Sequence, residues 1–100
     1  MGRLFMIEVR YQIRSGKRSE FYDKIREYGI DKASRNDSGN LRYEFFLPTD
    51  SDNELFLSEM WIDEPSQISH CDTEHFQKIQ LLKDEYVKNI ELKKYWIEEY

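Results

Sequence analysis

The 100-residue chain has a single cysteine, Cys71, so it has no second thiol with which to form an internal disulfide. It contains no apolar run near the roughly 20 residues that a membrane helix needs. Glu8 interrupts the apolar start of the chain before it is long enough for a signal peptide. Basic clusters are also missing: the 15 Lys and Arg are scattered, and the formal net charge is -5. These absences exclude a disulfide scaffold and argue against membranes and nucleic acids as partners, so we expect a cytoplasmic protein.

Apolar residues make up 39% of the chain and aromatic residues 15%, which favours a folded core over disorder. The length suits one domain, and we expect residues 1–100 to form it. A chain this short buries a modest core, so packing against a second copy would stabilise it.

Four segments alternate between apolar and polar residues with a period of two, which is typical of strands. They cover residues 4–14, 41–47, 54–62 and a last segment that follows Asn89. The last segment could instead extend the preceding helix. We predict a strand there, although Lys94 falls on its apolar side.

Between the first two strands, apolar residues recur at intervals of three and four from Ser19 to Ser34, which predicts one helix with Ser19 as its N-cap. Gly29 should weaken or bend this helix in its middle.

A second helical region follows the third strand, with Pro65 in its first turn. Asp72 or Thr73 would cap its second piece, whose apolar stripe runs over residues 76–87. The order strand, helix, strand, strand, helix, strand is the split βαβ arrangement of a ferredoxin-like α+β sandwich.

The sheet face away from the helices should be unusually apolar for a surface exposed to water. We therefore predict a homodimer in which two such faces pack back to back. The apolar residues on this face are Met6, Phe46, Phe56, Met60 and Ile62.

The stretch from residue 55 to 76 holds the candidate site, because both histidines of the chain lie in it. Glu59 stands between Leu57 and Trp61 on a strand face that should be buried, so its carboxylate must find a partner or take up a proton. His70 and His75 could fold over it. We predict Glu59 and His70 as catalytic residues, with His70 as the general base. Glu59 could alternatively accept backbone N–H groups at the start of the next helix.

Trp61, Tyr43, Phe76 and His75 are the predicted substrate-binding residues. The aromatic residues would also belong to the core, and His75 could be a cap or surface residue. Two histidines with Glu59 could bind zinc, but their spacing of five does not suit one helix face and no H-E-x-x-H motif is present, so we predict no metal.

Three motifs, G-N-L-R-Y-E-F-F-L-P, L-F-L-S-E-M-W and H-C-D-T-E-H-F, together resemble the antibiotic biosynthesis monooxygenase superfamily. The chain is most similar to its small YgiN-like quinol monooxygenase branch, over nearly its whole length. The resemblance implies a dimeric α+β barrel with a pocket between the sheet and helices of each protomer. Members include oxygenases of phenols and hydroquinones that use no metal, haem or flavin, while others degrade haem, isomerise a signalling sugar phosphate or have no known activity.

As the general base, His70 would remove a proton from a small phenolic or quinol-type substrate. The resemblance implies that the anion then reacts with dioxygen without a cofactor. The haem-degrading branch has an Asn on the first strand and a haem-binding His on the second helix. Val9 and about Gln80 stand there in this chain, which argues against haem. Two alternatives stay open: an isomerase of a small carbonyl or sugar-phosphate compound, and a dimeric ligand-binding or stress-related module without turnover.

Overall fold

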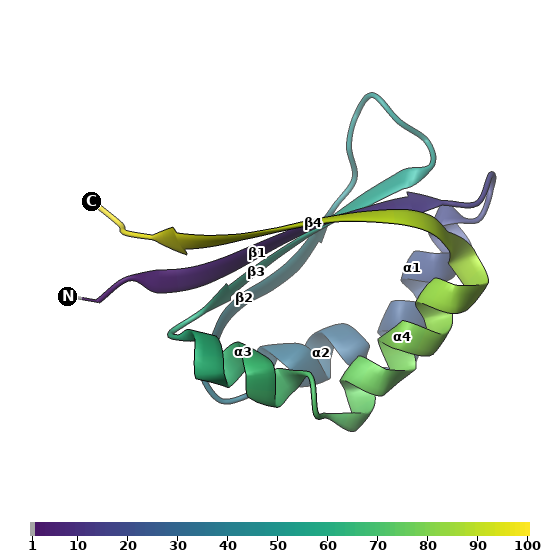
Figure 1. Ribbon diagram of the computed structural model, residues 1–100. Coiled ribbons are helices and arrows are strands. Elements are labelled where there is room, and N and C mark those ends of the chain that lie inside the picture. Colours follow the sequence, from purple (N-terminus) through teal and green to yellow (C-terminus); the bar gives the residue numbers. More distant parts are fainter. Residues whose placement is uncertain (1) are drawn as a thin grey trace.

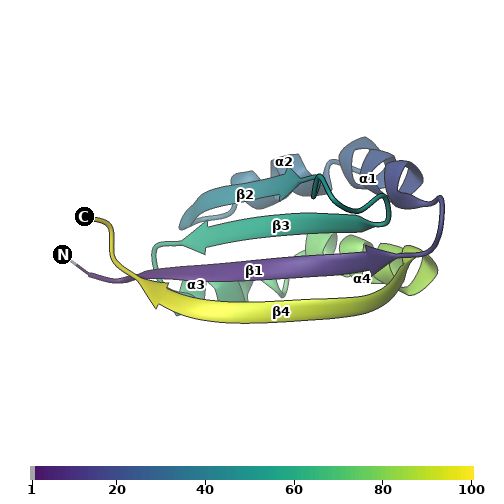
Figure 2. The same ribbon diagram turned by 90° about the horizontal axis from the view of Figure 1, so that it is seen from above.

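In the computed structural model, which describes residues 2–100, a four-stranded sheet is covered on one face by helices (Figure 1). The strands lie in the order β2-β3-β1-β4, and each neighbouring pair is antiparallel (Figure 2). This confirms the ferredoxin-like α+β sandwich. The elements in chain order are β1 (Leu4–Ile13), α1 (Arg18–Glu27), α2 (Ile30–Arg35), β2 (Asn40–Phe46), β3 (Glu54–Trp61), α3 (Glu64–His70), α4 (Glu74–Tyr86) and β4 (Val87–Ile97).

The central strand β1 contributes five side chains to the hydrophobic core. Its alternate residues from Phe5 to Ile13 are all at most 3% exposed, because a period of two places them on the face that the helices cover. Phe21 of α1 and Ile79 of α4 pack against them. The core therefore lies between one sheet face and the helices, as the alternation predicts.

The helix predicted over Ser19–Ser34 is two helices in the structure. Gly29 stands between α1 and α2 with φ of 69°, a left-handed conformation that ends the first helix rather than bending it. Ser19 is not the cap, because α1 begins at Arg18 and its N-cap residue, Lys17, makes no side-chain cap hydrogen bond. Within residues 2–100, no helix is long and apolar enough to cross a membrane.

Side-chain caps fix the starts of α3 and α4. Asp63 accepts a hydrogen bond of 2.9 Å from the backbone N–H of Ser66 at the start of α3. Thr73, one of the two predicted caps, accepts from the N–H of Phe76 at 3.2 Å and donates its hydroxyl to the carbonyl of His70 at 2.7 Å. Thr73 thus ties the last residue of α3 to the first turn of α4.

Strand β4 begins at Val87, earlier than the sequence suggests, and lies at the edge of the sheet. Its inner side is poorly covered by the helices, since Leu92 is 51% exposed and Trp96 48% exposed. Lys94 pairs with Ile7 across the sheet and belongs to this inner side. The lysine that breaks the apolar alternation therefore borders the space between the sheet and the helices.

Candidate active site

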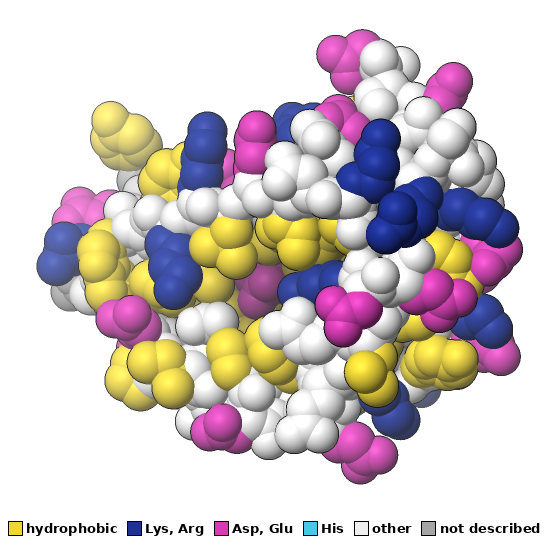
Figure 3. Space-filling view, turned by 45° about the vertical axis from the view of Figure 1, so that its right-hand side comes forward, with side chains coloured by type: hydrophobic (Ala, Val, Ile, Leu, Met, Phe, Trp, Pro, Cys, Tyr) yellow, Lys and Arg dark blue, Asp and Glu magenta, His cyan; other side chains and the backbone are white. Residues whose placement is uncertain are grey.

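A cavity of about 220 Å³ lies between the inner sheet face and helices α3 and α4. Its walls are mainly apolar and aromatic, and its polar lining includes Glu59, His70, Lys83 and Lys94. Figure 3 shows hydrophobic side chains gathered on one face of the molecule with acidic and basic side chains among them. A cavity of about 150 Å³ accepts benzene, so this volume suits one small substituted ring.

His70, the last residue of α3, is the most constrained polar group of the cavity. Its Nδ1 lies 2.6 Å from Oδ2 of Asp37, and its side chain is 2% exposed. Because a carboxylate only accepts hydrogen bonds, the ring proton is assigned to Nδ1, which leaves the lone pair on Nε2. His70 also lines the cavity, and of its two ring nitrogens it is Nδ1 that Asp37 engages.

Burial lowers the pKa of His70 below its ordinary value of 6.5. The hydrogen bond to Asp37 and the charge of that carboxylate oppose the lowering of the pKa without cancelling it. The imidazole is therefore neutral at pH 7, which is the form that can take up a proton.

Three predicted aromatic residues surround the His70 ring. The centroid distances to His70 are 5.1 Å from Trp61, 5.4 Å from Phe76 and 5.7 Å from Tyr43. Tyr43 and Phe76 also line the cavity, whereas Trp61 is fully buried and does not line it. Trp61 therefore packs behind the site, and Tyr43 and Phe76 present their rings to it.

Glu59 lines the same cavity but does not pair with either histidine. Oε1 of Glu59 accepts a hydrogen bond of 3.1 Å from Nε1 of Trp61, and the residue is 7% exposed. Burial raises the pKa of Glu59 from 4.5 to about 7, against the opposing effects of the Trp61 hydrogen bond and the charge of Lys83. The expected contact of Glu59 with the histidines is thus wrong, and its donor is an indole rather than the backbone N–H groups of α3.

His75 does not line the cavity, although its ring centroid lies 5.4 Å from that of His70. Its Nε2 is 2.8 Å from the same Oδ2 that binds His70. The possible metal-ligand atoms of Asp37, His70 and His75 all lie within 4.8 Å of one another, so this set could hold a small cation. In the structure the one carboxylate oxygen satisfies both rings, which makes the set a closed hydrogen-bond network.

Asp37 and Lys83 are site residues that the sequence did not predict. Asp37 lies in the turn between α2 and β2, where Gly39 has φ of 83° and a Cβ would come within 2.4 Å of Oγ of Ser66. This close approach holds the turn against α3, and only a glycine suits it. For Lys83 a signal does exist: it falls on the apolar stripe of the second helical region, where a lysine is unexpected.

The fold and the cavity define a small α+β protein whose cavity has the volume of a small ring compound and is lined by a histidine that a carboxylate holds from behind. The family model for antibiotic biosynthesis monooxygenase matches residues 4–81, and the chain belongs to this family.

Solved structures agree on the fold. A conserved protein from Methanosarcina mazei is 22% identical with a TM-score of 0.86, covering 96% of this chain and 94% of that one. A Pseudomonas aeruginosa protein, PA3566, is 18% identical with a TM-score of 0.83, covering 99% and 97%. A protein called an antibiotic biosynthesis monooxygenase is 18% identical with a TM-score of 0.78, covering 96% and 98%. Identities this low show the fold alone. No curated protein matched the chain.

Proposed function

We propose that this protein is a cofactor-independent monooxygenase of small phenolic or quinol-type compounds, with His70 as the general base. The observation that carries the proposal is the placement of His70: Asp37 holds Nδ1 at 2.6 Å while the ring lines a cavity of about 220 Å³. Family membership supports oxygenase chemistry. The substrate class rests on the resemblance to the YgiN-like branch, which stays a prediction.

In this scheme, Nε2 of His70 takes the proton of a ring hydroxyl, and Asp37 stabilises the imidazolium that forms. The electron-rich anion then donates an electron to dioxygen. One oxygen atom enters the ring and the other leaves as water, so hydroquinone yields a hydroxyquinone. The substrate supplies all the electrons, and no separate reductant is consumed.

Oxygen uptake with a panel of dihydroxyaromatic compounds tests the proposal. We expect His70→Gln to lower kcat about 100-fold or more, because the base is lost while the side-chain volume is nearly kept. Gln77→Ala, at an exposed position of α4, is the control and should keep wild-type turnover. A folded wild-type chain that consumes no oxygen with any of these compounds would overturn the proposal, as would a His70→Gln variant that keeps full activity.

One observation favours a second candidate, an isomerase. Glu59, with its pKa raised to about 7, is a second proton-transfer group in the same cavity as His70, and two such groups can take a proton from one carbon and return it to another. Exchange of a substrate proton for deuterium without oxygen uptake would favour this candidate. Saturable binding with neither exchange nor oxygen uptake would favour a binding module.

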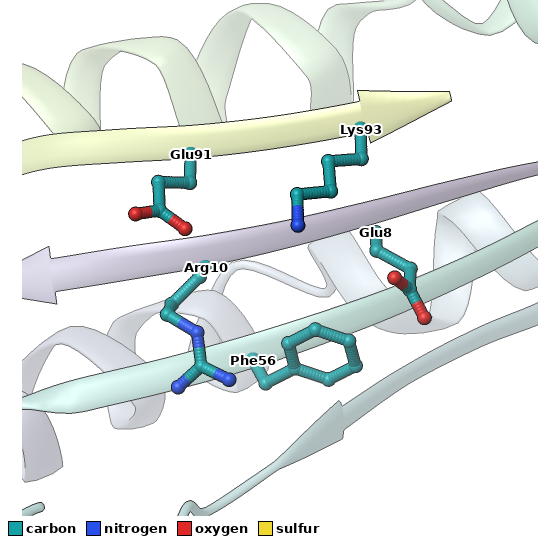
Figure 4. Close-up of a pocket in the computed structure, with 5 residues that line it drawn as sticks. All are labelled: Glu8, Arg10, Phe56, Glu91 and Lys93. Atoms are coloured by element: carbon teal, nitrogen blue, oxygen red, sulfur yellow. The ribbon is translucent and has the colours of Figure 1, made fainter. Parts of the chain in front are cut away.

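We also propose that the outer sheet face forms a homodimer interface, as the sequence predicts. A shallow hollow on this face is lined by Glu8, Arg10, Phe56, Glu91 and Lys93, with two acids and two bases around one aromatic ring (Figure 4). A two-fold rotation can set the acids of one copy against the bases of the other.

Other apolar side chains predicted on this face would be buried by the same packing. Phe46 is 46% exposed and Ile62 is 50% exposed. Each large apolar side chain buried contributes about 1.5–3 kcal/mol before the cost of association.

Light scattering during size-exclusion chromatography tests the dimer. We expect twice the chain mass for the wild type and a monomer for Phe56→Asp. Leu81→Asp is the matched control, because Leu81 is 70% exposed on α4, away from the sheet. A wild-type monomer at high protein concentration would exclude the interface.

A further inference from the structure

Lys83 is a cavity residue that the proposed reaction does not use. It stands in the last turn of α4, and its ammonium lies 5.7 Å from the ring centroid of Tyr11 and 5.6 Å from that of Phe76. A lysine in a last helical turn usually extends into water, where the negative end of the helix dipole stabilises it. This one instead lies partly buried between two rings that also line the cavity. Cation–π attraction to both rings fixes the ammonium in this place.

The charge of Lys83 is not neutralised by a direct partner. Within residues 2–100 it forms no ion pair within 4.0 Å, whereas Lys78 on the same helix pairs with Glu74 at 3.8 Å. Burial lowers the pKa of Lys83, and the charge of Glu59 opposes that change from a distance. Burying part of an ammonium without a carboxylate beside it costs free energy that the two rings offset only in part, and a ligand that supplies an anion would offset more of it.

The electrostatics of the cavity differ from those of the whole chain. The chain carries a formal net charge of -5, yet the cavity is lined by the two lysines Lys83 and Lys94 and by a single carboxylate, Glu59, whose pKa is raised to about 7. His70 is neutral at pH 7. The two lysines outnumber the one carboxylate, so the formal charge of the lining is positive whether or not Glu59 holds its proton, and an anion is attracted into a cavity inside an acidic protein.

We propose that Lys83 binds a carboxylate of the substrate, so that the substrate class is an aromatic ring that carries both a hydroxyl group and a carboxylate. The assignment of the hydroxyl to His70 rests on the proposed function, whereas the anion site rests on the surroundings of Lys83 alone. The cavity of about 220 Å³ fits one substituted ring, and a lysine ammonium gives a carboxylate a strong charge-assisted hydrogen bond. Tyr43 and Phe76 would flank the substrate ring. Its hydroxyl would contact His70 of α3, and its carboxylate would contact Lys83 of α4.

Calorimetric titration without oxygen tests the site, with dihydroxybenzoate and hydroquinone as the two probes. We expect the wild-type chain to bind dihydroxybenzoate about 10–100-fold more tightly, the difference expected for one hydrogen bond to a charged group. Lys83→Met should lose this preference while it still binds hydroquinone, which also shows that the variant is folded. Lys83→Arg should keep part of the preference, and Lys78→Met, which removes the same charge from the exposed side of α4, should keep all of it.

Equal affinity of the wild type for the two probes would overturn the anion site, and so would a preference that survives in Lys83→Met. Should Lys83→Met fail to fold, Lys83→Gln gives the same comparison with a polar side chain. Because no oxygen is present, these results do not depend on turnover. A chain that oxidises hydroquinone but shows no preference for the carboxylate would keep the proposed function and lose the anion site.

Discussion

Two carboxylates lie near His70, and their surroundings differ in the number of hydrogen-bond donors. Asp37, in the turn before β2, offers one oxygen to two imidazole rings, at 2.6 Å and 2.8 Å. Glu59, on β3, has the single indole donor of Trp61 at 3.1 Å and otherwise faces the cavity. Donors favour the charged form of a carboxylate, and burial without them favours the neutral form. The comparison shows why Asp37 suits the orientation of a histidine, while Glu59 suits a change of protonation near neutral pH.

The largest expected difference between the two carboxylates is in turnover. Asp37→Asn should lower kcat about 100-fold, because an amide no longer fixes the proton on Nδ1 of His70 or stabilises the imidazolium. Glu59→Gln makes the same chemical change at the other carboxylate and should cost less than about tenfold, since Gln still accepts from Trp61. Oxygen-uptake kinetics of the two variants, side by side, give the ratio.

The pH profile of the Asp37→Asn variant separates a positioning role from general damage to the fold. Asp37 raises the pKa of His70 through its hydrogen bond and its charge. Its removal lowers the pKa of His70, so the acid limb of kcat/KM should move to lower pH. An unchanged limb, or equal losses in the two variants, would contradict the roles given to the two carboxylates.

A further difference is expected in stability. The pKa of Glu59 is about 7 in the folded protein and ordinarily 4.5, so the folded state binds the proton more tightly than the unfolded state does. Wild-type stability is therefore lost as pH rises from 4.5 to 7, by up to about 3 kcal/mol. Glu59→Gln cannot ionise. It should be more stable than the wild type in urea at pH 8 and similar to it at pH 4. A difference that is the same at both pH values would point to packing instead of charge.

The smallest expected effect is that of chelation. Both rings already donate to Oδ2 of Asp37, so the Asp37, His70 and His75 set needs no metal to be satisfied. Prolonged dialysis against EDTA should leave turnover and Tm unchanged. A loss of turnover or Tm that added zinc restores would show instead that Asp37, His70 and His75 bind a metal ion.

Much of the fold could be predicted because local patterns report it directly. The alternation from Phe5 to Ile13 reflects burial against helices, and Pro65 and Thr73 mark helix starts through backbone geometry and capping. Gly29 was harder to interpret. The same residue can bend a helix or end it, and the outcome depends on whether φ becomes positive in the packed structure.

The site was only partly predictable, because its key contact is long-range. The sequence brings His70, Glu59 and Trp61 together through their nearness along the chain. Asp37 lies 33 residues before His70 and reaches it through the packing of a turn against α3, which no periodicity reports. Lys94 is the opposite case. The sequence alone shows that Lys94 interrupts the apolar alternation of β4. Only the structure explains this interruption, because Lys94 lines the cavity.

The hydrogen bond from Trp61 to Glu59 also gives the protein an intrinsic optical probe. The indole of Trp61 is fully buried, donates Nε1–H to the carboxylate of Glu59 and lies 5.1 Å from the imidazole of His70, measured between ring centroids. The chain has one other tryptophan, Trp96, which is 48% exposed. Replacing Trp96 with Phe leaves Trp61 as the single tryptophan, which can be excited selectively over the seven tyrosines and lies beside both ionisable groups. Its fluorescence can follow ligand entry and proton uptake in real time, without a label.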